Sequence, residues 1–267
     1  MLTVRAEESM GKLIKLVLML IVAAAFTGAG YYMGTSETKP PVLREAFSSS
    51  AEKTPVTVEK KMMAESFLFL ESLRKISPEK YKEIKREMGD YDSMTYEQKL
   101  AWVNKITGLT AVLLIDRVPY ASDEALNAFA VAVKEQADGY LIKDPSGQLC
   151  FNNFFPGLNK FPQDKLAVSY NEADIRMLKT VNLILTSSLE NRNSHSVSEH
   201  DAYRVLGAVS QKLSEKYGDQ VNLLSNPEEG AKDPVMTCRI VGDFYELFTQ
   251  EPDKSATAEA LRQILSD

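Results

Sequence analysis

The feature that most constrains this chain is an apolar segment close to its N-terminus. The 18 residues from Leu16 to Met33 contain no charged side chain, and Lys12 and Lys15 stand directly before them. A stretch of that length is at the short end of what crosses a hydrocarbon core of about 30 Å. Tyr31 and Tyr32, near its C-terminal end, lie where an interfacial aromatic belt would fall. The sequence therefore predicts a membrane-targeted chain whose remaining residues are exported.

Two interpretations of this segment stay open. The basic start, the short apolar run and the three alanines at 23–25 are typical of a cleaved signal peptide. The low-polarity stretch continues well past those alanines, which favours a signal-anchor helix that stays in the membrane. In the second case the protein is a single-pass inner-membrane protein with its C-terminal body in the periplasm. In the first case the body is secreted into the periplasm.

The chain divides into four parts. Residues 1–15 form a cytoplasmic N-terminus, residues 16–34 the anchor or signal segment, residues 35–56 a linker rich in proline and serine, and residues 57–267 an exported domain. The first 34 residues hold three basic and two acidic side chains, so of the net charge of -6 the remainder carries -7. Phosphate backbones require clustered lysine and arginine, so the composition predicts no nucleic-acid partner.

Apolar residues recur at helical spacing throughout the exported domain, and sustained period-2 alternation is absent. The sequence therefore predicts an all-α fold with about eight or nine helices in the body. Helix starts are expected at Ser77-Pro78, Thr95, Ser122 and Ser198, helix ends at Gly89, Gly139 and Gly218, and a last helix at 255–265. The predicted inward faces comprise Met63, Phe67 and Leu70; Leu100, Val103, Ile106 and Leu113; Leu126, Phe129, Val133 and Ala137; Ile175, Leu178, Val181, Leu185 and Leu189; and Ala202, Leu206, Val209, Leu213 and Tyr217.

One pattern occurs twice in the exported domain. Asp144-Pro145 precedes Cys150, and Asp233-Pro234 precedes Cys238. Aspartate is a favoured N-cap and proline a favoured first helical residue, so each cysteine is expected about one turn inside a new helix. The repetition suggests two related helical hairpins, at 122–155 and 198–249. The alternative is two independent helix starts of a common kind.

The chain contains only two cysteines, Cys150 and Cys238, 88 residues apart. Exported compartments are oxidising, so the sequence predicts a structural disulfide between them. Cys238 shares its helical face with Val241, Tyr245 and Phe248, which predicts that this cysteine lies in the core. The alternative is two independent buried thiols, because a free cysteine behaves as a small hydrophobic residue.

Residues that could carry chemistry are sparse. A metal site would use His195 and His200 with Glu199 or Asp201, but the five-residue spacing matches no zinc motif and straddles the helix start expected at Ser198. No phosphate-binding loop, dinucleotide fingerprint or nucleophile elbow occurs. The sequence therefore predicts no catalytic residue, no cofactor and no metal. Arg239 and Asp243, four apart, are expected to form a surface ion pair.

These observations favour a membrane-anchored exported helical protein with a structural or protein-interaction role and a protein partner in the envelope. Such a role leaves no catalytic motif. Two alternatives remain. One is an exported helical hydrolase that uses a histidine or an acid, and the other is a module that binds a small apolar ligand between its helices.

Overall fold

The computed structural model describes residues 68–89, 93, 95, 98, 109–155, 172–190 and 197–266. These ranges form about ten helical elements and no strand, which confirms the predicted all-α body for the part of the chain that the structure describes. Among these residues no helix is long and apolar enough to cross a membrane. The predicted anchor at 16–34 and the linker at 35–56 lie outside the described residues. The predicted inward residues Met63, Phe67, Leu100, Val103 and Ile106 lie outside them too.

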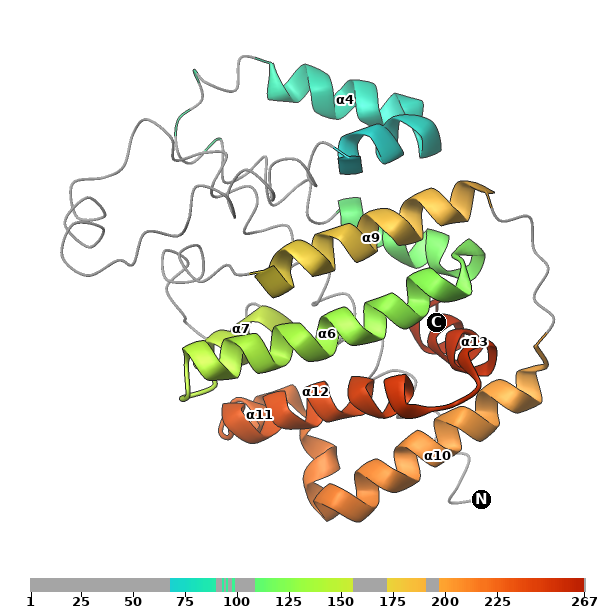
Figure 1. Cartoon of the computed structure of the whole chain (residues 1–267). Coiled ribbons are helices and arrows are strands. Elements are labelled where there is room, and N and C mark those ends of the chain that lie inside the picture. Colours follow the sequence, from blue (N-terminus) through green and yellow to red (C-terminus); the bar gives the residue numbers. More distant parts are fainter. Residues whose placement is uncertain are drawn as a thin grey trace.

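Four long helices form successive layers. Helix α6 (Asp123–Lys143) packs between α9 (Glu172–Glu190) and α12 (Pro234–Gln250), and α10 (Glu199–Tyr217) packs on α12. Figure 1 shows the order α9, α6, α12, α10 across the body. The C-terminal helix α13 (Lys254–Ser266) packs against α6 and α10 at one end of these layers.

Shorter elements complete the described part. The helix at 109–117 runs into the 3-10 turn η2 (Val118–Tyr120), and η2 contacts α9 and α13. Residues 68–76 are helical and contribute Phe69 and Leu73 to the same buried cluster as the long helices. The remaining elements are α4 (Pro78–Met88), α7 (Gln148–Phe154), η3 (Gly218–Leu223) and α11 (Pro227–Gly230).

Most predicted helix starts are capped, as the sequence predicts, by hydrogen bonds between residues three apart. The amide of Thr95 donates to the Gln98 side chain at 2.8 Å, and the Gln98 amide donates back to the Thr95 hydroxyl at 3.3 Å. The hydroxyl of Ser122 accepts from the amide of Ala125 at 3.3 Å and caps α6. Such side-chain acceptors satisfy amides that have no partner within the helix.

The predicted inward faces are largely confirmed where the structure describes them. Buried members are Leu113 in the helix at 109–117; Leu126, Phe129, Val133 and Ala137 in α6; Ile175, Leu178, Val181 and Leu185 in α9; Ala202, Val209 and Leu213 in α10; and Cys238, Val241, Tyr245 and Phe248 in α12. Leu189, predicted inward in α9, is 38% exposed, so this prediction is wrong. Leu189 is the last but one residue of α9, beyond the packed part of that helix.

Two predicted helix boundaries also differ. Gly139 does not end α6, which continues four residues further to Lys143. The next residue, Tyr140, is buried and hydrogen-bonded to α9, so tertiary contacts outweigh the low helix propensity of glycine. Ser77 precedes α4 as predicted, but its side chain makes no capping hydrogen bond.

The two cysteine-bearing helices start differently. Asp233 caps α12 as predicted, because its carboxylate accepts from the amide of Met236 at 3.0 Å. Asp144, by contrast, ends α6, and α7 begins only after Gly147, whose φ of 73° is left-handed. The Asp144 carboxylate still accepts from the amide of Leu149 at 2.8 Å, so it caps α7 from a position further back in the chain. The predicted start of the first cysteine-bearing helix is therefore wrong.

Candidate functional site

A disulfide joins the two cysteines that the sequence pairs. Cys150 is the third residue of α7, Cys238 is the fifth of α12, and their Cα atoms lie 6.1 Å apart. Both residues have no exposed surface. Reductants therefore reach these sulfurs only when α7 separates from α12, which is typical of a structural disulfide rather than a catalytic one.

The strongest candidate for chemistry is a buried carboxylate between α6 and α9. Asp174, in the first turn of α9, is 1% exposed. Its Oδ1 atom accepts from Gln136 Nε2 at 2.8 Å and from the Tyr140 hydroxyl at 2.5 Å. Gln136 and Tyr140 are one turn apart on α6 and both are buried, so α6 presents two donors side by side to a single acceptor.

A cation lies near this carboxylate. Lys143 follows Tyr140 by three residues at the end of α6, and partial burial lowers the pKa of its ammonium group while the charge of Asp174 opposes that shift. A second charged contact joins the same two helices, because the guanidinium of Arg176 donates to the Glu135 carboxylate. The α6–α9 contact is therefore polar at the end where α9 begins.

A carboxylate, a phenol and an amine are groups that acid–base catalysis uses. Here the phenol and the Gln136 amide donate to the same oxygen of Asp174, and both donors lie inside the protein. These bonds hold α6 against α9, and the placement of Asp174 in a first turn is favourable because helix N-termini stabilise negative charge. The geometry favours a cross-helix contact over a reaction site.

A second carboxylate cluster lies between α10 and α12. Asp243 accepts from the ammonium of Lys216 and from the hydroxyl of Tyr217, rather than pairing with Arg239 as the sequence predicts. Burial alone would raise the pKa of Asp243, but the hydrogen bonds from Lys216 and Tyr217 and the nearby lysine charges outweigh it, so the pKa is lowered. Burial and the bond to Asp243 raise the pKa of Tyr217. This cluster links two layers of the body.

The histidines do not form a described site. His200 is exposed in the first turn of α10, and His195 lies outside the described residues. Ser198 caps α10 as predicted, because its hydroxyl accepts from the amide of Asp201 at 3.2 Å. Among the described residues, no three histidine, cysteine, aspartate or glutamate side chains are placed to hold a metal ion.

The sequence does not single out Asp174 as a candidate site residue. The available signal was positional: Gln136 stands between Val133 and Ala137 on a face that is otherwise apolar. A polar residue at a buried helical position needs a partner, and that need could have drawn attention to α6.

No family model, no curated protein and no solved structure matches this chain. Its function must therefore be argued from its own residues.

Proposed function

We propose that the protein is a membrane-anchored exported helical domain with a structural or protein-interaction role in the cell envelope. The observation that carries this proposal is the buried disulfide between Cys150 and Cys238. Persistent structural disulfides belong to oxidising compartments and are rare in the cytosol. The uncharged segment from Leu16 to Met33 supports delivery to such a compartment.

The alternatives receive less support from the described residues. A hydrolase would need an accessible nucleophile beside a base, whereas the donors at Asp174 are buried and bonded to that carboxylate. A small apolar-ligand module would need a cavity, and the aromatic side chains around Tyr245 pack directly on one another, with ring centroids 5.3 Å from Phe244 and 6.0 Å from Phe129.

The same proposal includes two related helical hairpins, one formed by α6 and α7 and the other by α10 and α12. In each hairpin a long helix begins at a serine cap, Ser122 or Ser198. The disulfide then joins the second helix of one hairpin to the second helix of the other.

Protease accessibility tests the topology. Full-length protein in intact spheroplasts should lose its body to added protease, because the body lies on the outer side of the inner membrane. Released periplasmic fractions, assayed in parallel, separate an anchored chain from a cleaved one. A body that is digested only after the membrane is lysed would contradict export.

Thiol labelling tests the compartment independently. Alkylation in denaturant without reductant should leave Cys150 and Cys238 unmodified in protein taken directly from cells. A variant with Lys12 and Lys15 changed to glutamate should remain in the cytoplasm and show both thiols labelled, because the basic residues before the apolar segment guide its insertion. Two labelled thiols in the parent protein would count against export.

A chemical cross-linker applied to intact cells tests the interaction role. The full-length protein should enter a complex of defined mass that survives mild detergent. A protein that remains at monomer mass over a range of cross-linker concentrations would contradict a stable partner, while leaving the topology result intact.

A further inference from the structure

The C-terminal helix α13 is attached in a different way from the other long helices. Its buried apolar side chains are three alanines and three larger aliphatic residues, Leu261, Ile264 and Leu265. Helix α12, by comparison, buries two aromatic residues and a disulfide. Helix α13 is therefore docked by aliphatic packing, without the buried aromatic rings or the covalent bond that fix α12.

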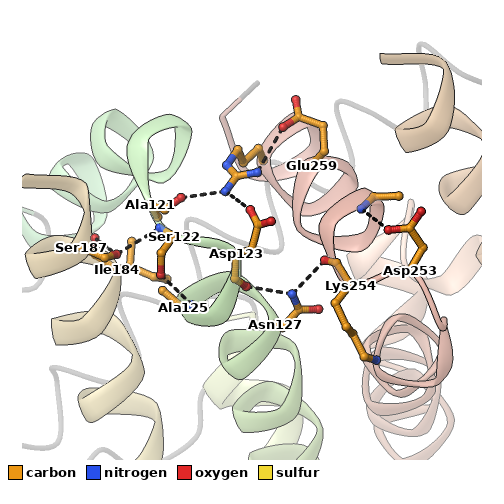
Figure 2. A network of polar contacts seen from close by, with 12 residues as sticks. Ala121, Ser122, Asp123, Ala125, Asn127, Ile184, Ser187, Asp253, Lys254 and Glu259 are labelled. Atoms are coloured by element: carbon orange, nitrogen blue, oxygen red, sulfur yellow. Dashed lines mark hydrogen bonds and ion pairs between the residues drawn. The ribbon is translucent and has the colours of Figure 1, made fainter. Parts of the chain in front are cut away.

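Polar contacts hold both ends of α13, as Figure 2 shows. Near the C-terminal end, Arg262 donates through one nitrogen to the Ala121 carbonyl at 2.7 Å and to the Asp123 carboxylate at 2.6 Å. Its other terminal nitrogen donates to Glu259 on the same helix at 3.1 Å. At the N-terminal end, Asn127 donates to the Lys254 carbonyl at 3.0 Å.

Docking of α13 also leaves polar atoms without partners. Among the described residues, seven buried side-chain nitrogen or oxygen atoms make no hydrogen bond, and three of them belong to α13: Arg262 Nε, Gln263 Oε1 and Ser266 Oγ. A buried polar atom without a hydrogen bond lowers the stability of the folded state. The loss is about as large as the gain from burying one to three methylene groups. The three atoms therefore offset much of what the few large apolar side chains contribute.

The connection to α12 allows α13 to move as a unit. Residues 251–253 link the two helices, with Pro252 exposed between Glu251 and Asp253. Glu251 has an extended backbone, and its carboxylate accepts from the ammonium of Lys212 in α10 at 2.6 Å. The start of the linker therefore stays attached to α10 when α13 moves. Asp253 caps α13 through the amide of Ala256 at 3.0 Å, a bond internal to the segment that survives undocking.

We infer that α13 is a displaceable latch, which undocks and redocks while α6, α9 and α12 stay folded. When it opens, it uncovers the surfaces of α6, α10 and η2 on which it packs. The hydrogen bonds of Arg262 to Ala121 and Asp123, here called the clamp, oppose undocking. Hydration of the three partnerless atoms favours undocking, so the balance between the two sets how often the latch opens. This inference does not depend on the proposed function.

Hydrogen exchange of the full-length protein in mild detergent, followed by mass spectrometry at low denaturant concentrations, tests the latch. Amides in the middle of α13, at 259–264, should exchange at least about 10-fold faster than the slowest amides of α12, and with a smaller dependence on denaturant. Equal exchange rates and equal denaturant dependence in the two helices would overturn the inference, because α13 would then open only with the whole body.

A matched pair of substitutions in the first turn of α6 isolates the clamp. Asp123→Asn removes the charge that faces Arg262, and Glu124→Gln removes the same charge from an exposed neighbour on the same helix end. Asp123→Asn should speed exchange of α13 by about 5-fold without changing α12, whereas Glu124→Gln should leave both helices unchanged. Equal effects of the two variants on α13 would overturn the role of the clamp. Arg262→Lys, which keeps the charge but loses the forked geometry, should also speed exchange in α13 alone.

Discussion

The two faces of α6 differ in how they bury a tyrosine hydroxyl. Toward α9, Gln136 and Tyr140 meet the Asp174 carboxylate, which accepts from both. Toward α12, Phe129 meets Tyr245 in an edge-on contact, and the Tyr245 hydroxyl makes no hydrogen bond although the residue is 1% exposed. A tyrosine thus lies in the core on each side, and only one of the two hydroxyls bonds to Asp174.

This difference indicates what holds each interface. The α9 face depends on directed bonds to a carboxylate, so its strength depends on the presence of that acceptor. Helix α12 is held by aromatic packing on α6 and by the disulfide to α7, neither of which needs a hydrogen-bond partner for Tyr245. Three sets of substitutions test this contrast, from the largest expected effect to the smallest, and a fourth concerns the contact between α12 and α10.

Removing the disulfide should have the largest effect. The bond closes a loop of 88 residues. Replacing both Cys150 and Cys238 by alanine should lower the free energy of unfolding by about 4 kcal/mol, mainly because the unfolded chain becomes less restricted. Urea unfolding of the parent under oxidising and reducing conditions, beside the double variant, measures this loss. A double variant as stable as the oxidised parent would show that aromatic packing alone holds the α12 side.

Asp174→Ala should be nearly as damaging. It removes the common acceptor of Gln136 and Tyr140 inside the protein, with an expected loss of about 3 kcal/mol. Asp174→Asn is the matched control, because its amide oxygen can still accept from both donors but carries no charge, and it should lose less than the alanine variant. Urea unfolding midpoints compare the two. If Asp174→Ala proved neutral, the α9 face would be held by apolar packing like its counterpart.

Replacing tyrosine by phenylalanine should change the free energy of unfolding in opposite directions on the two faces of α6. Tyr140→Phe removes a donor from Asp174 and should lower the free energy of unfolding by about 1–2 kcal/mol. Tyr245→Phe removes a hydroxyl that makes no hydrogen bond and should raise it by about 1 kcal/mol. Thermal and urea unfolding of the two variants provide the measurement. Losses of equal size would remove the distinction between the faces.

The smallest effect concerns pH and the contact between α12 and α10. The folded-state pKa of Asp243 lies below the ordinary value of 3.8. Its contribution is therefore fully present above that ordinary value and is lost as pH falls through it toward the folded-state pKa. Asp243→Asn should cost at most about 1 kcal/mol at pH 7, and the difference from the parent should shrink as pH falls below 3.8. Unfolding measurements from pH 7 to pH 3 test this, and a difference that stays constant would exclude the charge as its cause.

The sequence predicts those parts of the fold that local bonds decide. The caps at Ser122, Ser198 and Asp233 each join residues three apart, so a short stretch of sequence contains both partners. The inward faces follow from helical spacing alone. The disulfide could be predicted because the chain offers only one pairing of its two cysteines.

Hydrogen bonds between residues far apart in the chain could not be predicted from local sequence. Asp174 bonds to residues 34 and 38 positions away, and Arg262 bonds to residues 139 and 141 positions away. The same cause explains the wrong helix end at Gly139, where Tyr140 is held by α9. Local propensity favoured termination there, and a tertiary contact overrode it.

The turn that precedes Cys150 has a consequence for how the protein matures. A Cβ atom at Gly147 would lie 2.6 Å from the backbone nitrogen of Val235, because this turn lies directly on the first turn of α12. A side chain at position 147 would therefore displace this turn or the start of α12, and α7, which carries Cys150, begins at the next residue. The absence of a side chain at this position lets α7 approach α12 closely enough for the two sulfurs to meet. A larger residue there is expected to lower the yield of the disulfide and to leave thiols that can pair with other chains.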